Sequence, residues 1–145
     1  MAKSWKIIAA AIVYMIISMV LRTVESMMTM DYYTNPDYFP VWSEIMMPGP
    51  GGPPTEFYYY SIIFAFIEGL IFAGVYTVIA KGVPGKTVVK KGINYGLLIW
   101  LLAGIPFSLG MVLLINLPID LIAIWTVTSL IIYLIVGATT ARIVK

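Results

Sequence analysis

Four apolar stretches, each close to the roughly 20 residues that an α-helix needs to cross a bilayer, occupy most of this chain. They run from about Trp5 to Val24, Tyr58 to Ala80, Ile93 to Ile115 and Leu121 to Val144. These crossings leave no room for a soluble domain in 145 residues, of which 61% are hydrophobic and only 11% are charged. We therefore predict an all-α, polytopic protein in which residues 1–145 form a single integral membrane domain, a bundle of four transmembrane helices.

The charged residues are sorted between the loops, and this sorting predicts the orientation of the chain. Basic residues gather in the N-terminus, the second loop and the C-terminus: Lys3, Lys6, Lys81, Lys86, Lys90, Lys91, Arg142 and Lys145. Acidic residues gather in the other two loops, where Arg22 is the only base nearby: Glu25, Asp31, Asp37, Glu44, Glu56 and Asp120. Loops rich in Lys and Arg stay in the cytoplasm. We therefore expect a multi-pass protein of the cell (plasma) membrane with both termini cytoplasmic.

The first apolar stretch follows two lysines, as the core of a secretory signal does. Signal cores are about 7–15 residues long, and the run from Trp5 to Leu21 is longer. The sequence that follows it, Arg22-Thr23-Val24-Glu25, lacks the small residues of a cleavage site. We therefore expect a retained helix.

Two absent residue types limit the chemistry of the chain. It has no cysteine and no histidine, which excludes disulfides, thiolate nucleophiles, axial histidine ligands of haem and most zinc sites. No nucleophile–base pair and no phosphate-binding glycine loop is recognisable, and no basic stripe indicates nucleic acid. We expect a protein that is not an enzyme and that uses no cofactor, no metal and no nucleic acid.

The nine methionines leave one metal alternative open. Met15 and Met19 are four residues apart in the first stretch, and others cluster beyond it: Met27, Met28, Met30, Met46 and Met47. Thioethers bind Cu(I), so these residues could form a copper path. Methionine is also an ordinary flexible apolar side chain. We expect the second role.

The only long loop, about residues 25–57, is predicted to carry a short helix at the outer membrane interface. Asn35-Pro36 suits a helix start, because Asn can cap the helix and Pro fits its first turn. Pro48 to Pro54 can be neither helix nor strand and returns the chain to the bilayer. Aromatic rings prefer the interface, so the predicted outer anchor comprises Phe39, Trp42, Tyr58, Tyr59 and Tyr60.

The other connections are short. Lys81 to Lys91 reads as a basic inner turn, and Asn116 to Asp120 is a tight turn that makes an antiparallel hairpin of the last two crossings. Pro106 stands in the third crossing and is predicted to kink it, because proline cannot donate the helical hydrogen bond.

Glu68 is the acidic residue that stands out in this sequence, because it lies inside an apolar stretch. It lies near the middle of the second crossing, where an acidic side chain costs about 2.5–3.5 kcal/mol on translocon scales. With no Lys or Arg expected inside a crossing, we expect Glu68 to be protonated and to share its proton with a hydroxyl at similar depth. The candidates are Tyr14, Ser18, Ser108, Ser129 and Tyr133. Two roles stay open: a coupling or ligand-contacting carboxyl, and a neutral group that fixes helix register by a hydrogen bond across the bundle.

Small residues recur every four positions along the same crossing. This helix-packing ridge comprises Ser61, Ala65, Gly69, Ala73 and Thr77. Ridges of this kind let two helix backbones approach closely in a membrane. The spacing predicts tight contact, and it leaves open whether the partner helix belongs to the same chain.

The second half carries a set of recognisable features. Lys91-Gly-Ile-Asn-Tyr-Gly-Leu-Leu-Ile-Trp100 follows the basic turn, Pro106 stands in mid-helix, Leu117-Pro-Ile-Asp-Leu-Ile-Ala-Ile-Trp125 opens the last stretch, and Gly137 lies within it. In these features residues 58–144 resemble a loose group of small, uncharacterised prokaryotic integral membrane proteins with four helices. The resemblance implies the architecture and no active-site residue. The long outer loop with its Pro-Gly run departs from that group.

Two functions follow from these expectations. The first is a non-enzymatic accessory or scaffold subunit that packs against another membrane protein through the ridge and the outer aromatic segment. The alternative is a small transporter or channel with Glu68 as a proton-carrying carboxyl. Four helices rarely enclose a path, so the alternative requires a homo-oligomer. The expected partners are therefore the lipid bilayer and either a second copy or another membrane protein, and the sequence favours the accessory role.

Overall fold

The computed structural model describes residues 4–49 and 51–145, and it contains helices and no strand within those ranges. The long helices are α1 (Ser4–Met28), α3 (Thr55–Ile79), the consecutive α4 (Val88–Ile99) and α5 (Ile105–Leu114), and α6 (Ile119–Val144). They provide four helical segments long and apolar enough to cross a membrane, which confirms the prediction at that level. Lys3 and Pro50, assigned above to the basic N-terminus and to the Pro-Gly run, lie outside the described residues.

The third membrane segment is helical from Val88 to Leu114 but changes its winding in the middle. Between α4 and α5, residues Trp100–Gly104 form a π-helical turn, η2, in which the N–H of Ile105 bonds to the carbonyl of Trp100, five residues back. Pro106 follows directly and has no N–H to donate. A kink was predicted at Pro106, and the structure has a wide π-helical turn just before that residue. Such turns within α-helices are frequent at functional sites.

Two helices extend beyond the apolar stretches that predicted them: α4 at its start, where a polar side chain caps it, and α1 at its end. Thr87 accepts a hydrogen bond from the N–H of Lys90 at 3.1 Å, so α4 begins at Val88, and Lys90 and Lys91 belong to its first turn instead of to the preceding loop. At the outer end, α1 continues to Met28, four residues past its predicted limit.

The long loop between α1 and α3, which is predicted to be the outer one and is called the outer loop below, contains a short α-helix, α2 (Met30–Thr34), and a 3-10 helix, η1 (Pro36–Val41). The helix ends next to it are called the outer ends. Asn35 accepts a hydrogen bond from the N–H of Asp37 at 3.0 Å and thus caps η1. Trp42 lies just after η1, and its ring packs 5.1 Å from Tyr33 and 6.2 Å from Trp125. This segment therefore rests on the outer ends of α5 and α6, where Leu117, Leu121 and Ile122 are buried.

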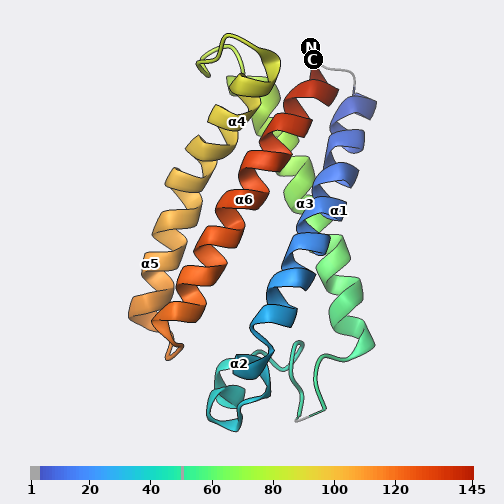
Figure 1. The fold of residues 1–145 in the computed structure, drawn as a ribbon. Helices are drawn as coiled ribbons and strands as arrows, with labels where there is room; N and C mark the ends of the chain where they lie inside the picture. The colour runs from blue at the N-terminus through green and yellow to red at the C-terminus, as the bar shows by residue number, and fades with distance from the viewer. Residues whose placement is uncertain (1–3, 50) are drawn as a thin grey trace.

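The helices pack in an order that leaves α3 and α5 apart. α1 packs against α3 and α6, and α4 packs against α6, whereas α3 and α5 share no extended interface. Ser4 and Lys145 lie at one end of the bundle, and the helix pairs α1–α3 and α5–α6 spread apart toward the other end (Figure 1). The main buried core lies toward the end of the bundle that carries the chain termini, and its largest members are Tyr14, Phe72, Tyr76, Tyr95, Ile132 and Val136. The Tyr95 hydroxyl ties α4 to α3 by donating to the Phe72 carbonyl at 2.7 Å.

Glycines set the closest contacts between helices. A Cβ built on Gly96 would lie 2.0 Å from the carbonyl oxygen of Tyr133, and one on Gly92 would lie 2.3 Å from the carbonyl oxygen of Gly137. On α3, a Cβ at Gly69 would lie 2.7 Å from the carbonyl oxygen of Ala11. These contacts involve backbone atoms, which cannot move aside singly. The pairs α4–α6 and α1–α3 therefore depend on having no side chain at these positions.

We predict that Gly96→Ala lowers the free energy of unfolding by about 1–3 kcal/mol, because the added methyl group must push α4 away from α6. The matched control is Gly110→Ala on α5, where a Cβ meets nothing within 4 Å. The loss of helicity of each purified variant in mixed micelles with increasing dodecyl sulfate measures the difference. Equal stability of the two variants would contradict the proposed close packing.

Candidate functional site: a cavity in the outer half of the bundle

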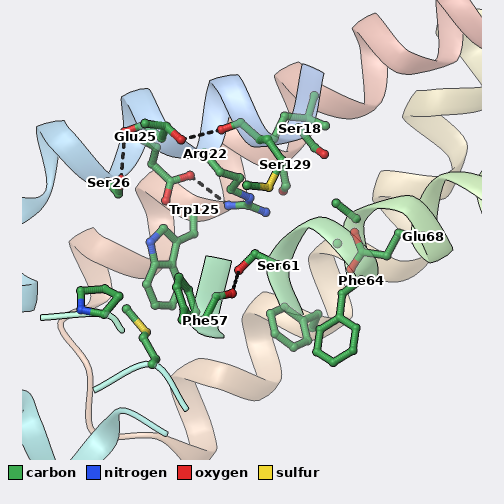
Figure 2. A pocket seen from close by; sticks show the side chains of 18 of the residues that line it. Ser18, Arg22, Glu25, Ser26, Phe57, Ser61, Phe64, Glu68, Trp125 and Ser129 are labelled. Atoms are coloured by element: carbon green, nitrogen blue, oxygen red, sulfur yellow. Dashed lines mark hydrogen bonds and ion pairs between the residues drawn. The ribbon is translucent and has the colours of Figure 1, made fainter. Parts of the chain in front are cut away.

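A cavity of about 880 Å³ lies between the helices, in the half of the bundle that faces away from the chain termini. That volume is within the range of about 300–1,000 Å³ typical of ligand sites. Figure 2 shows Ser18, Arg22, Glu25, Phe64, Glu68 and Trp125 among the side chains around it. Its walls come from α1, α2, α3, α6 and the η2–α5 region, and Met46, Met47 and Pro53 of the outer loop line its outer end.

The cavity exists because α3 and α5 stand on opposite sides of it without packing together. Phe64 of α3 and Phe107 of α5 both line it, and their side chains are 57% and 67% exposed. No extended interface closes the space between these two helices, so the cavity is open on that side. In a bilayer this lateral mouth would open toward the acyl chains.

Glu68 lies on the wall of this cavity instead of inside the packed core. The nearest hydrogen-bond partner is the Tyr14 hydroxyl, which donates to the Glu68 carboxyl over a long 3.4 Å. The other hydroxyls expected to share its proton also line the cavity, but Ser18, Ser108 and Ser129 donate to the backbone carbonyls of Met15, Gly104 and Thr126. The cavity therefore brings together the whole predicted set, and of its serines none bonds to Glu68 among the described residues.

A second acidic group lines the cavity nearer its outer end, and it is neutralised. Arg22 donates to the Glu25 carboxylate at 2.9 Å, one turn away on α1. The Glu25 side chain is 5% exposed and that of Arg22 is 47% exposed, so the cation lies between the buried carboxylate and the open cavity. Arg22 is eight residues beyond Tyr14 on α1, which places it about 12 Å farther along the helix axis than the level of Glu68.

This pair corrects the expectation that no base lies inside a crossing, since Arg22 belongs to α1. Its proximity to Glu25 was visible in the sequence, because residues three apart are neighbours on a helix surface. That both would face the same cavity as Glu68 depends on how α1 is rotated against α3, which the spacing does not determine.

The remaining wall is aromatic and rich in methionine. Rings from α1, α2, α3, α5 and α6 line it, together with Met19, Met30, Met46, Met47 and Met111. Trp125 donates its indole N–H to the Tyr33 hydroxyl at 3.2 Å. Burial raises the pKa of Tyr33, against the smaller opposing effect of that hydrogen bond, so this hydroxyl stays uncharged.

The other predicted site residues fall in three places. Ala65, Gly69 and Ala73 of the ridge are buried, with Gly69 against α1, while Ser61 lines the cavity and Thr77 donates to the Gly74 carbonyl at 2.7 Å. Phe39 and Trp42 are half-buried, and Trp42 packs on the outer ends of α5 and α6. Tyr58, Tyr59 and Tyr60 are exposed in the first turns of α3.

Two findings bear on the metal alternative. Within residues 4–49 and 51–145, no group of three or more acidic side chains is arranged to hold a metal ion. Met19 lines the cavity and its predicted partner Met15 does not, so the proposed copper pair is not brought together there.

Comparisons with protein-family models, with curated proteins and with solved structures find no match to this chain. The resemblance to small prokaryotic membrane proteins with four helices therefore stays a prediction.

We predict that dicyclohexylcarbodiimide, an apolar reagent that reacts with protonated carboxyl groups, modifies Glu68 in membranes. The reagent can enter through the lateral mouth, and Glu68 has no cation bonded to it among the described residues. Peptide mass spectrometry should find one adduct on Glu68 and none in Glu68→Gln. Modification of Glu25 in place of Glu68 would show that the assignment of the paired and unpaired carboxyls is wrong.

We predict that Arg22→Gln destabilises the fold, because it leaves the buried Glu25 without its cation. Removing one partner of a fully buried pair costs about 3–5 kcal/mol, and the partial exposure of Arg22 reduces the expected cost to about 1–2 kcal/mol. The double variant Arg22→Gln/Glu25→Gln should recover most of the loss in the same unfolding assay. Additive losses in the double variant would mean that the pair is not coupled.

Proposed function

We propose that the protein is a small membrane transporter in which Glu68 is the coupling carboxyl. The observation that carries the proposal is the position of Glu68 on the wall of a ligand-sized cavity, with one long hydrogen bond from Tyr14. A glutamate that fixed helix register would instead be enclosed and bonded across the bundle. Intramembrane carboxyls that face a cavity mark substrate and proton pathways more often than structural sites.

In this function the Glu68 carboxyl holds either a proton or a substrate. When a substrate that competes for the carboxylate binds, the proton leaves to water, and it returns when the substrate departs. The titratable groups that face Glu68 are the hydroxyls of Tyr14 on α1 and Tyr133 on α6, with Arg22 farther out and already paired. Neither group is a cation that could pair with the carboxylate.

A single chain in this conformation offers an entrance and no exit. Beyond Glu68 the bundle is filled by the aromatic core around Phe72, Tyr76 and Tyr95. Transport therefore requires rearrangement of the helices or a second copy of the chain, and we propose that the working unit is a homo-oligomer in the lipid bilayer.

The accessory role rested mainly on the ridge of small residues. In the fold its central members, Ala65, Gly69 and Ala73, are buried, and Gly69 packs against α1 of the same chain. They are thus not available to another membrane protein. The geometry favours transport for this reason as well.

We further propose that the ends of the chain are cytoplasmic, which places the cavity in the outer leaflet. The basic residues of the α3–α4 loop and of the C-terminus support this orientation. The segment from Pro36 to Trp42 would then lie at the outer membrane surface, and Tyr58, Tyr59 and Tyr60 would anchor the start of α3 at the same level.

Proton-coupled exchange can be tested in liposomes that contain the purified protein and a pH-sensitive dye. Under an imposed pH gradient, a panel of cationic, neutral and anionic amphiphiles is added one compound at a time. At least one class should dissipate the gradient faster than in protein-free liposomes, and Glu68→Gln should abolish the difference. Glu56→Gln, the same change on the same helix outside the cavity, should not alter it.

Two results would overturn the proposed function. One is a panel in which no compound of any charge acts beyond the protein-free background. The other is a Glu68→Gln protein that retains the full effect while remaining helical and monodisperse.

A further inference from the structure

We infer that the ligand of this cavity is an apolar organic cation that enters from the bilayer and uses Glu68 as its counter-charge. The inference rests on the proposed function and names its substrate class. Four features of the cavity point to this class: its entrance, its charge balance, the direction of its hydrogen bonds and its aromatic lining.

The entrance selects for solubility in lipid. Met46, Met47 and Pro53 of the outer loop line the end of the cavity that would face water. The open side lies between α3 and α5, where Phe64 and Phe107 are exposed toward the acyl chains. A molecule that reaches Glu68 by this route must first partition into the membrane.

The charge balance selects for a cation. Arg22 and Glu25 cancel each other at 2.9 Å, and an anion brought to Arg22 would meet the Glu25 carboxylate beside it. Tyr33 stays uncharged, because burial raises its pKa. Glu68 is thus the one ionisable acid of the cavity wall without a cation bonded to it in the described residues.

The hydrogen bonds made by the cavity wall favour a ligand that carries a hydrogen-bond donor. Its serine hydroxyls direct their protons to backbone carbonyls of their own helices, so they offer oxygen lone pairs to the cavity and not N–H or O–H donors. This holds for Ser18, Ser26 and Ser61, and in part for Ser108 and Ser129, whose oxygens each already accept one hydrogen bond, from the Thr126 hydroxyl and from the Trp100 indole N–H. Oxygen atoms in this orientation favour a positive charge or an N–H group on the ligand.

The lining of the cavity suits an apolar cation. Tyr14, Phe64 and Tyr133 line it on the side of Glu68, and Phe57 and Trp125 line it farther out. Cations bind over the faces of aromatic rings, and methionine side chains adapt to ligands of varied shape. This combination accommodates bulky organic cations better than a small hydrated ion.

The depth of Glu68 excludes the headgroup of a lipid as the source of this cation. Glu68 is thirteen residues after Thr55, the first residue of α3, and thus lies about 20 Å from the outer end of that helix. A headgroup ammonium stays at the membrane surface. The positive group that meets Glu68 must belong to a molecule that moves freely through the bilayer.

The test uses two probes of nearly the same shape and opposite charge, tetraphenylphosphonium and tetraphenylborate. Binding of each to the purified full chain in uncharged detergent is measured by equilibrium dialysis, with empty micelles as the blank. We expect saturable binding of the cation alone. Glu68→Gln should weaken it at least tenfold, Glu68→Asp should retain a measurable part of it, and Glu56→Gln should leave it unchanged. Phe64→Leu should weaken it about two- to fivefold through loss of a ring face.

The inference is overturned if tetraphenylborate binds as tightly as tetraphenylphosphonium, or if Glu68→Gln binds the cation like the native chain. If Glu68→Gln does not fold, Glu68→Asp serves in its place. Should every folded variant at this position bind tetraphenylphosphonium as tightly as the native chain, Glu68 is not the counter-charge. The liposome panel separates this failure from that of the proposed function. If proton exchange depends on Glu68 but occurs only with neutral or anionic compounds, the proposed transport function holds and the inference of a cationic ligand is wrong.

Discussion

Close backbone contact on the side of the bundle that carries the termini is the constraint on which the rest of the molecule depends. Gly92 and Gly96 on α4 bring that helix against Gly137 and Tyr133 of α6, and Gly69 brings α3 against α1. These contacts hold each pair together, α4 to α6 and α3 to α1. The two pairs diverge from each other toward the opposite end (Figure 1), and the cavity lies in the space between α3 and α5.

A cavity with polar walls inside a membrane is stable only if its polar groups find partners. Most do so locally, since the serine hydroxyls bond to carbonyls one turn away and Arg22 bonds to Glu25 within α1. The long hydrogen bond from Tyr14 leaves Glu68 as the exception. A carboxyl with one long hydrogen bond on the wall of a cavity supports the proposal that Glu68 contacts a ligand.

Much of the architecture could be predicted because each membrane helix carries its own signal. Hydropathy located the crossings, and Asn35-Pro36 located a helix start that Asn35 does cap. The helix that follows is a 3-10 helix, ending at Val41, because Pro40 interrupts the backbone donors. The predicted site was less accessible to this reasoning. Glu68 was identified by its depth, but the pairing of Arg22 with Glu25 and the shared cavity depend on helix rotation.

The sequence by itself determined that the chain is helical, that four segments can cross a membrane and that Glu68 stands among apolar neighbours, because length, hydropathy and local caps act within a single helix. Only the tertiary structure decided that both carboxyls line one cavity, Glu25 paired with Arg22 and Glu68 without a cation bonded to it in the described residues. It also decided that the ridge of small residues packs against α1 of the same chain at Gly69. Those outcomes depend on how helices distant in sequence rotate and spread against one another, and glycines at a few crossing points control both.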